Sequence, residues 1–513
     1  MSKDATQSTF LFNGNVLTLD DRNTVGTGLL IEDGRISRVA TGSERPTSGH
    51  RLIDLDGATV LPGFIDPHAH PLSLGASLGA IDCSPSFVSS IAEIVDRIAE
   101  AASDSRGDWI RARGYDELLL AEGRHPNAVD LDRAAPGRPI RLSHGSGHGD
   151  VLSTTAMKVL GLNRDSIAPP GASIEHDPVS GVPTGVMFEM GGWLRDRMPT
   201  PSDEALNEYA EIASSAFVAA GVTAVTDAGR DNTADRAALY AALVSAGRFL
   251  PRPTVMQSPD STFPMPGETP GVRSGATKIA ITFSGGEMHP DFETLVAQIS
   301  AAHEANRQVA IHAVELEAVV MASEAFTAVG PKSDISNLRH RIEHGSECPP
   351  EISAMIAAAG LSVVTQPGFI YERGDRYLRA SANAHGAEPG SLYAAQDLLT
   401  AQVHVAASSD TPFGPIAPLI GIQAAVTRTS SSGNLVGPEQ AISVMDALRM
   451  YGPNAAWVDH REAEIGSLEP GKLADLVVLQ SDLIKISPAE IGAIPVMGTL
   501  IAGKVVHGSL PGD

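Results

Sequence analysis

Eight short apolar runs constrain the fold of this chain more than any other feature. Longer stretches separate the runs, and two of these stretches, 203–221 and 291–307, carry apolar residues at helical spacing. Strands buried in a parallel sheet are nearly continuous apolar runs, and a helix usually connects each one to the next. Eight strands alternating with helices predict a (β/α)8 TIM barrel, in which the loops after the strand C-termini build the site. The predicted strands are 61–70, 222–229, 252–259, 277–282, 308–315, 340–345, 361–367 and 403–410.

The two ends of the chain differ from this middle part. Residues 1–60 and 465–513 contain short β-rich runs that glycine turns interrupt. Neither end is long enough for a good sheet alone, so we predict one small, discontinuous β-sandwich domain built from both. The barrel then occupies residues 61–464 of an α/β fold, and residues from about 71 to 200, which match no barrel repeat, form a large insertion after the first strand.

Net charge and the distribution of apolar residues indicate which kinds of molecule the chain binds. The formal net charge of −24 at pH 7 opposes binding to nucleic acids and to anionic membranes. No run of about eighteen apolar residues predicts a membrane span, and the N-terminus lacks the apolar stretch of a signal peptide. We therefore expect a cytoplasmic enzyme with a small-molecule substrate. The oligomeric state stays open, and exposed barrel helices are compatible with a homo-oligomer.

Metal-binding side chains stand at the ends of four predicted strands. His68 and His70 end the first strand, His312 lies in the fifth, His344 ends the sixth and Asp410 ends the eighth. A spacing of two on a strand puts the first two rings on one side. All five side chains should converge at the barrel mouth. Nitrogen and oxygen ligands suit Zn²⁺ first, with Mn²⁺ and Fe²⁺ as alternatives.

The stretch RHRIEHG, residues 339–345, contains the string H-x-x-E-H of inverted zinc metalloproteases. That motif requires a helix, but Gly345 and the Pro-Pro pair after it disfavour a long helix here. We interpret the stretch as a barrel strand in which His344 is the ligand and His340 is structural. Glu343 is expected to face the surrounding helices or to orient a neighbour.

Four motifs resemble the amidohydrolase superfamily, and within it the amidohydrolase-3, or YtcJ-like, branch. They are PGFIDPHAH, IEHGS, SSDTP and GSLEPGKLADLVVL (466–479), and the resemblance extends nearly end to end through RPIRLSHGSGH (138–148) and PTGVMFE (183–189). The resemblance implies a β-sandwich and a metal-bearing barrel, with the four histidines and Asp410 at the family's metal positions. In binuclear members a carboxylated lysine on the fourth strand bridges two ions. Lys278 matches that place, its alternative being an ordinary lysine at a strand start.

The resemblance also suggests catalytic and substrate-binding residues. The run H-A-V-E after the fifth strand resembles the mononuclear deaminase branch, in which the glutamate shuttles protons, so Glu315 is a candidate catalytic acid. Its alternative is a solvated glutamate at a helix start. Position within the branch suggests four substrate contacts, each with an alternative as a capping or loop residue: His148, Glu189, Gln366 and Tyr371.

The chemistry expected from this set is hydrolysis of C–N bonds other than peptide bonds, in an amide, cyclic amide or N-acyl small molecule. A metal-activated hydroxide would attack, and Asp410 would act as general base and then as general acid. One alternative is a deaminase-like aminohydrolase with one ion and Glu315. A non-catalytic scaffold is disfavoured, because a scaffold does not need four histidines and an aspartate that converge.

Overall fold

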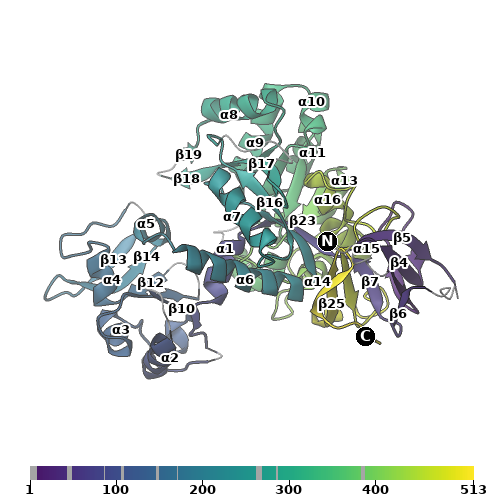
Figure 1. Ribbon diagram of the computed structural model, residues 1–513. Coiled ribbons are helices and arrows are strands. Elements are labelled where there is room, and N and C mark those ends of the chain that lie inside the picture. Colours follow the sequence, from purple (N-terminus) through teal and green to yellow (C-terminus); the bar gives the residue numbers. More distant parts are fainter. Residues whose placement is uncertain are drawn as a thin grey trace. The chain divides into compact units, whose positions relative to one another are not determined.

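The computed structural model describes residues 8–42, 49–85, 87–104, 109–145, 149–169, 172–261, 269–284, 287–382 and 387–512 (Figure 1). The chain divides into two compact units, one formed by residues 1–73 with 213–513 and the other by residues 74–212. Across the described residues, none of the helices combines the length and apolar character that a membrane crossing requires.

A β-sandwich in the first unit contains strands from both chain ends. Its four-stranded sheet has the order β5-β4-β1-β6, and its six-stranded sheet has the order β26-β25-β24-β7-β2-β3. The chain ends meet where β7 pairs antiparallel with β24, through Val60 and Val478 among others. The strands are β1 (Thr9–Phe12), β2 (Asn15–Leu17), β3 (Val25–Gly26), β4 (Gly28–Glu32), β5 (Arg35–Ala40), β6 (Arg51–Asp54), β7 (Thr59–Pro62), β24 (Leu476–Leu479), β25 (Val496–Ile501) and β26 (Lys504–Gly508).

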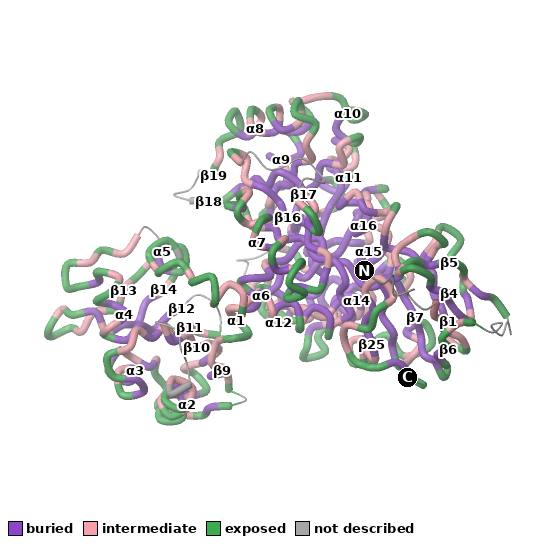
Figure 2. Tube along the Cα trace, viewed as in Figure 1, coloured by how far each residue is buried: buried purple, intermediate pink, exposed green. Residues whose placement is uncertain are grey.

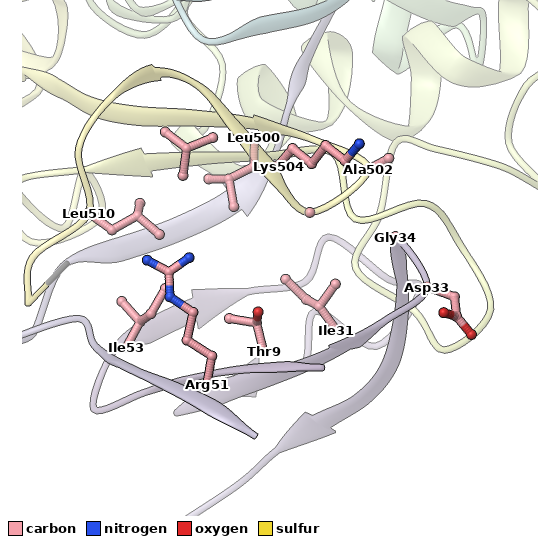
Figure 3. Close-up of a pocket in the computed structure, with 12 residues that line it drawn as sticks. Thr9, Ile31, Asp33, Gly34, Arg51, Ile53, Leu500, Ala502, Lys504 and Leu510 are labelled. Atoms are coloured by element: carbon pink, nitrogen blue, oxygen red, sulfur yellow. The ribbon is translucent and has the colours of Figure 1, made fainter. Parts of the chain in front are cut away.

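Apolar side chains from both sheets form the sandwich core, with Leu29 and Ile53 from one sheet and Val60 and Leu476 from the other. Each such aliphatic side chain contributes about 1.5–3 kcal/mol on burial. A cavity of about 420 Å³ lies at one edge of this core, between Ile31 and Arg51 of one sheet and Leu500 and Lys504 of the other (Figure 3). No predicted site residue lines it.

Eight parallel strands form the barrel of the same unit, in the order β8-β15-β16-β17-β20-β21-β22-β23. Backbone hydrogen bonds from Asp410 N–H to His68 O (2.9 Å) and from His70 N–H to Thr411 O (2.9 Å) join the last strand region to the first. The strands are almost wholly buried (Figure 2). They are β8 (Phe64–Ala69), β15 (Val222–Asp227), β16 (Arg252–Gln257), β17 (Arg273–Ala280), β20 (Val309–Ala313), β21 (Arg341–His344), β22 (Ser362–Thr365) and β23 (His404–Ala407).

These eight strands confirm the predicted barrel. Some strand boundaries were misplaced. The run predicted as the first barrel strand, 61–70, begins within β7 of the sandwich, and β8 starts only at Phe64. β17 begins at Arg273 rather than at residue 277. Its first residues, Arg-Ser-Gly-Ala, have little strand propensity, so the apolar pattern did not include them. Gly63 connects β7 of the sandwich to β8 of the barrel, and an added Cβ would lie 2.3 Å from Thr223 Cγ2. Only glycine allows the connection to pass this close to Thr223 of β15.

Helices and short elements follow the barrel strands. The helical patterns predicted at 203–221 and 291–307 correspond to α6 and α8. The elements are α1 (Pro71–Leu78), α6 (Asp203–Ala219), α7 (Ala234–Ser245), β18 (Thr282–Ser284), β19 (Glu287–His289), α8 (Phe292–Glu304), α9 (Leu316–Val329), α10 (Lys332–Asn337), α11 (Pro350–Ala359), α12 (Gly368–Ala382), η2 (Pro389–Ser391), α13 (Ala395–Thr400), α14 (Pro418–Thr427), η3 (Pro438–Gln440), α15 (Val444–Tyr451), α16 (Pro453–Val458) and η4 (Pro488–Ala493).

The second compact unit has its own six-stranded mixed sheet, ordered β13-β14-β12-β11-β10-β9. Two apolar clusters cover it, one containing Ile94 and Leu142 and the other Met187 and Leu194. The elements are β9 (Ile81–Asp82), α2 (Ile91–Asp104), β10 (Ile110–Tyr115), η1 (Glu117–Leu119), α3 (Ala128–Ala134), β11 (Ile140–His144), β12 (Gly149–Leu152), α4 (Thr154–Val159), β13 (Ser173–His176), β14 (Pro183–Phe188) and α5 (Gly191–Arg197).

Candidate metal centre

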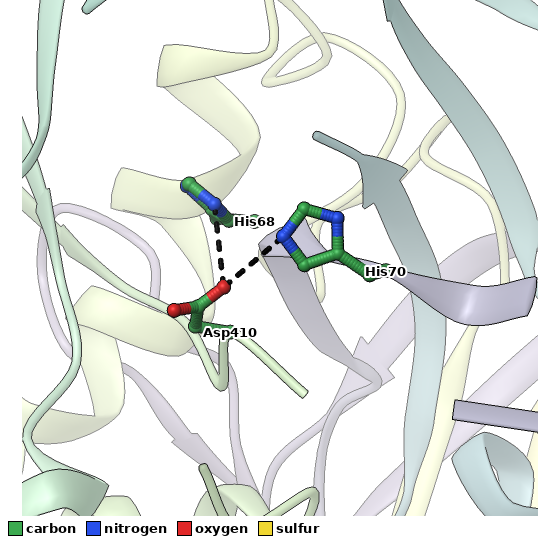
Figure 4. A group of neighbouring side chains, drawn as sticks. All are labelled: His68, His70 and Asp410. Carbon is green, nitrogen blue, oxygen red and sulfur yellow. Dashed lines mark ion pairs between the residues drawn. The ribbon is translucent and has the colours of Figure 1, made fainter. Parts of the chain in front are cut away.

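Three predicted ligands meet at the C-terminal end of the barrel strands. His68 lies near the end of β8, His70 follows that strand directly, and Asp410 lies just beyond β23. The Nε2 atoms of His68 and His70 lie 3.5 and 3.3 Å from the same Asp410 oxygen, Oδ1 (Figure 4). One ligand atom from each residue lies within 4.8 Å of the other two. This convergence is what binding of a single ion requires.

The other three predicted ligands extend this group. The His344 ring centroid lies 4.8 Å from that of His68 and 4.5 Å from that of His312. Lys278 is buried in the second half of β17, and its Nζ lies 3.5 Å from His68 Nε2. The structure therefore brings together all six side chains that the sequence suggested as metal ligands, although only three of them form the tightest cluster.

Unusual backbone conformations occur at two of these positions. His344 has a φ angle of 75° and Asp410 one of 53°, both in the left-handed region. For a non-glycine residue this conformation costs about 1–2 kcal/mol. A hydrogen bond from Gly345 N–H to Ala313 O (3.0 Å) holds the turn after His344. Because strained residues cluster at functional sites, these angles agree with a role for the two side chains.

A buried network of charged side chains contacts Nδ1 of His68, the ring nitrogen that faces away from Asp410. Glu343 pairs through Oε2 with His68 Nδ1, which leaves Nε2 of the ring facing Asp410. The other Glu343 oxygen accepts a hydrogen bond from Arg341 Nε at 2.6 Å, and Arg341 Nη1 pairs with Asp459 Oδ1 at 2.9 Å. Arg341 and Glu343 are almost fully buried. Ligating histidines usually have such a partner on the second ring nitrogen, which fixes the ring orientation.

Glu343 therefore orients a neighbour, the second of the two roles suggested for it, and does not face the surrounding helices. Arg341 and Glu343 are two residues apart, so both point to the same side of β21. The left-handed backbone at His344 breaks the alternation, and its ring also lies beside His68. The sequence analysis missed Arg341 and Asp459. The string R-x-E in a buried strand was the available signal, because opposite charges at that spacing can pair inside a barrel.

Gln366 holds a second histidine. Its Oε1 lies 2.8 Å from His344 Nδ1, and its amide nitrogen donates to Ser408 Oγ (3.0 Å) and Val364 O (3.2 Å). Gln366 is fully buried and directly follows β22. All its polar atoms are thus engaged within the protein, in a geometry that fits a positioning role for His344 better than a substrate contact.

The chemistry of the donors fits a divalent ion. Burial lowers the pKa of His68 and His344 well below the usual value and that of His312 to about 4, so these rings are neutral at pH 7. A neutral imidazole has a free lone pair for a metal. His344 Nε2 is buried and has no hydrogen-bond partner among the residues that the structure describes. A bound ion would satisfy that atom.

Comparison with known proteins identifies the family. The sequence model Amidohydro_3, described as an amidohydrolase family, matches residues 51–507. This chain belongs to the amidohydrolase family. It is an enzyme that acts on C–N bonds, and its barrel confirms the fold that the motifs implied.

Two curated relatives and one solved structure resemble this amidohydrolase over nearly its whole length. An N-substituted formamide deformylase from Arthrobacter pascens is 27% identical, covering 96% of this chain and 97% of the relative. A putative amidohydrolase, YtcJ, from Bacillus subtilis is 25% identical, covering 96% and 98%. An uncharacterized metal-dependent hydrolase from Pyrococcus horikoshii shares the fold with a TM-score of 0.76 at 21% identity, covering 94% and 100%.

Four predicted catalytic or substrate-binding residues of this amidohydrolase remain. Glu315 is exposed at the position before α9 and its side chain makes no cap hydrogen bond. Tyr371 is half-buried in α12 and packs beside Phe369 and its neighbours. Glu189 is exposed after β14 in the second unit, and His148 lies outside the described residues. Roles in catalysis or substrate binding for these four residues stay predictions.

Acid should destabilise this amidohydrolase through His340, which precedes β21. Its Nδ1 accepts a hydrogen bond from Val309 N–H (2.9 Å), its Nε2 lies 3.0 Å from His303 Nδ1, and burial lowers its pKa to about 3. The unfolded chain binds a proton near pH 6.5 that the folded chain does not. The stabilisation that neutral His340 gives to the folded chain is therefore complete above about pH 6.5, and it is lost as the pH falls toward 3.

The variant His340→Asn keeps a hydrogen-bond acceptor but does not titrate. We expect it to reduce the pH dependence of the unfolding free energy between about pH 6 and pH 4, by up to about 1.4 kcal/mol per pH unit. Urea denaturation at a series of pH values measures this slope. A slope equal to that of the wild type would show that His340 does not carry the effect.

Proposed function

We propose that this amidohydrolase hydrolyses the C–N bond of a small non-peptide amide, cyclic amide or N-acyl compound at a divalent metal centre in the barrel mouth. The observation that carries the proposal is the approach of His68 Nε2 and His70 Nε2 to one oxygen of Asp410, at 3.5 and 3.3 Å. The neutral histidines around it support a metal role. Nitrogen and oxygen donors favour Zn²⁺, with Mn²⁺ and Fe²⁺ as alternatives.

The residues of the centre have different roles in the proposed reaction. When bound, the ion supplies Lewis acidity, which lowers the pKa of water and polarises the substrate carbonyl. Asp410 accepts the proton of the attacking water and then donates it to the leaving nitrogen. One carboxylate serves both steps, because the second step returns it to its ionised form. Glu343 and Gln366 keep the rings of His68 and His344 in the orientation that ion binding needs.

A substrate panel tests the reaction. The deformylase relative makes N-substituted formamides the first class to assay, followed by other N-acyl compounds, cyclic amides and aminated heterocycles. We expect turnover of an amide, with a carboxylate and an amine as products for the acyclic members. Release of ammonia from aminated heterocycles alone, abolished by Glu315→Gln, would contradict the proposal and identify a deaminase. Liquid chromatography with mass detection distinguishes the two product sets.

We further propose that Lys278 is carboxylated and bridges two ions. Burial lowers its pKa to about 8, so part of the amine is neutral at pH 7 and can react with carbon dioxide. Its Nζ lies 3.5 Å from His68 Nε2, and this short distance supports the proposed role.

The variant Lys278→Met should therefore reduce the ion content by about one per chain. Elemental analysis of the purified protein measures the content, and mass spectrometry under native conditions detects the added carbon dioxide. Arg307→Met, which removes a cation from the loop before β20, is the control. An unchanged ion count in Lys278→Met would contradict the bridging role.

A further inference from the structure

A second group of metal-ligating side chains lies in the compact unit of residues 74–212. Asp116, Glu117 and His144 each offer one ligand atom, and these atoms all lie within 4.8 Å of one another. None of the three belongs to the centre described above, and the sequence analysis assigned no role to any of them.

Strand pairing brings these residues together. His144 ends β11, and Asp116 and Glu117 follow β10, its parallel neighbour in the sheet. An irregularity in the register between Arg113 and Tyr115 places Tyr115 opposite His144. The Glu117 carboxylate then lies between two imidazoles, with Oε2 at 2.7 Å from His144 Nε2 and Oε1 at 3.7 Å from His125 Nε2.

The orientations of the four side chains are fixed by their neighbours. The buried Tyr115 hydroxyl lies 3.0 Å from His125 Nδ1, so the Nε2 of that ring is directed toward Glu117. The Tyr115 ring packs edge-on against His144 at 5.0 Å and against His125 at 5.9 Å. Asp116 Oδ1 accepts a hydrogen bond from Leu118 N–H (3.0 Å). Ligating histidines usually have a hydrogen-bond partner on the second ring nitrogen, as His125 has in Tyr115.

We propose that Asp116, Glu117 and His144 bind a divalent transition-metal ion, with His125 as the fourth ligand. Two imidazoles and two carboxylates form a donor set that suits Zn²⁺. Four protein ligands leave no open position for a substrate, so the site is structural. It ties the ends of β10 and β11 to the loop that carries His125.

Zinc counting on the full-length protein tests this site. The double variant His68→Ala/His70→Ala removes the tight barrel cluster and provides the background. After chelation, reloading with Zn²⁺ and desalting, we expect the added changes Glu117→Gln and His144→Ala to remove about one ion per chain from this background. His176→Ala, in the same unit but outside the group, should leave the content unchanged. Equal zinc content with and without the two added changes would overturn the proposal.

A measurement on the unmutated protein covers the case in which the variants fail to fold. Zn²⁺ at micromolar concentration should protect His125 and His144 from modification by diethylpyrocarbonate, with His176 as the internal reference. Mass spectrometry of peptides quantifies the modification at each residue. Loss of reactivity at both histidines supports the site, and equal reactivity with and without Zn²⁺ overturns it.

Discussion

Asp410→Asn is expected to lower kcat by about 10²- to 10⁴-fold while the fold and most of the bound metal are retained. The amide has the size of the carboxylate and keeps one oxygen that can ligate. It cannot accept the proton of water or return a proton to the leaving nitrogen. Asp410 Oδ1 lies within 3.5 Å of His68 Nε2 and His70 Nε2, and Asp410 is the one carboxylate in this group of described residues, so nothing in the group replaces it.

The measurement is kcat on the best substrate of the panel, together with metal content and thermal unfolding of the same preparation. Asp21→Asn is the matched control, because the Asp21 side chain is fully exposed and the change removes the same charge. Turnover in Asp410→Asn within a few-fold of the wild type would refute the assignment of the acid–base role.

Arg341→Met should cause the largest loss of stability, about 3–5 kcal/mol, because it leaves buried carboxylates without their cation. Arg341 pairs with Glu343 at 2.6 Å and with Asp459 at 2.9 Å, and only 1% of its side chain is exposed. Glu343 also holds the Nδ1 atom of His68. We therefore expect the affinity for the metal to fall as well, by about 10- to 100-fold.

Arg339→Met is the matched control for this prediction. Arg339 pairs with Glu462 at 2.7 Å, but 19% of its side chain and 41% of its partner's are exposed. Solvent screens such a pair, so we expect a loss of about 1 kcal/mol or less. Urea denaturation measures both variants, and competition with a chelator measures metal affinity. Equal effects of the two changes would show that the buried network does not hold His68.

The sequence was sufficient to predict the barrel, because its strands are short, continuous apolar runs. It also predicted that the candidate ligands meet, since His68, His70, His344 and Asp410 stand at or just beyond the ends of such runs, where a barrel must bring them together. The start of β17 was missed because Ser274 and Gly275 interrupt the apolar pattern.

The hydrogen bonds that orient the predicted ligands could be identified only from the structure. Glu343 and His68 are 275 positions apart, and no local pattern shows that they pair. The left-handed backbone of His344 turns its ring back toward the mouth, against the alternation expected in a strand. Gln366 is suggested as a substrate contact only by its position within the amidohydrolase-3 branch. Its contacts with His344 became visible only in three dimensions.

The most direct measurement of the central claim follows turnover and metal content together on one preparation. The protein is stripped with a chelator, then reloaded with increasing Zn²⁺, and hydrolysis of the best amide substrate is followed at each step. We predict that the stripped protein is inactive, that turnover rises as ions bind at the barrel centre, and that His68→Ala/His70→Ala recovers neither turnover nor the ions of that centre. Full turnover in protein without bound ions would contradict a metal-dependent centre at His68, His70 and Asp410.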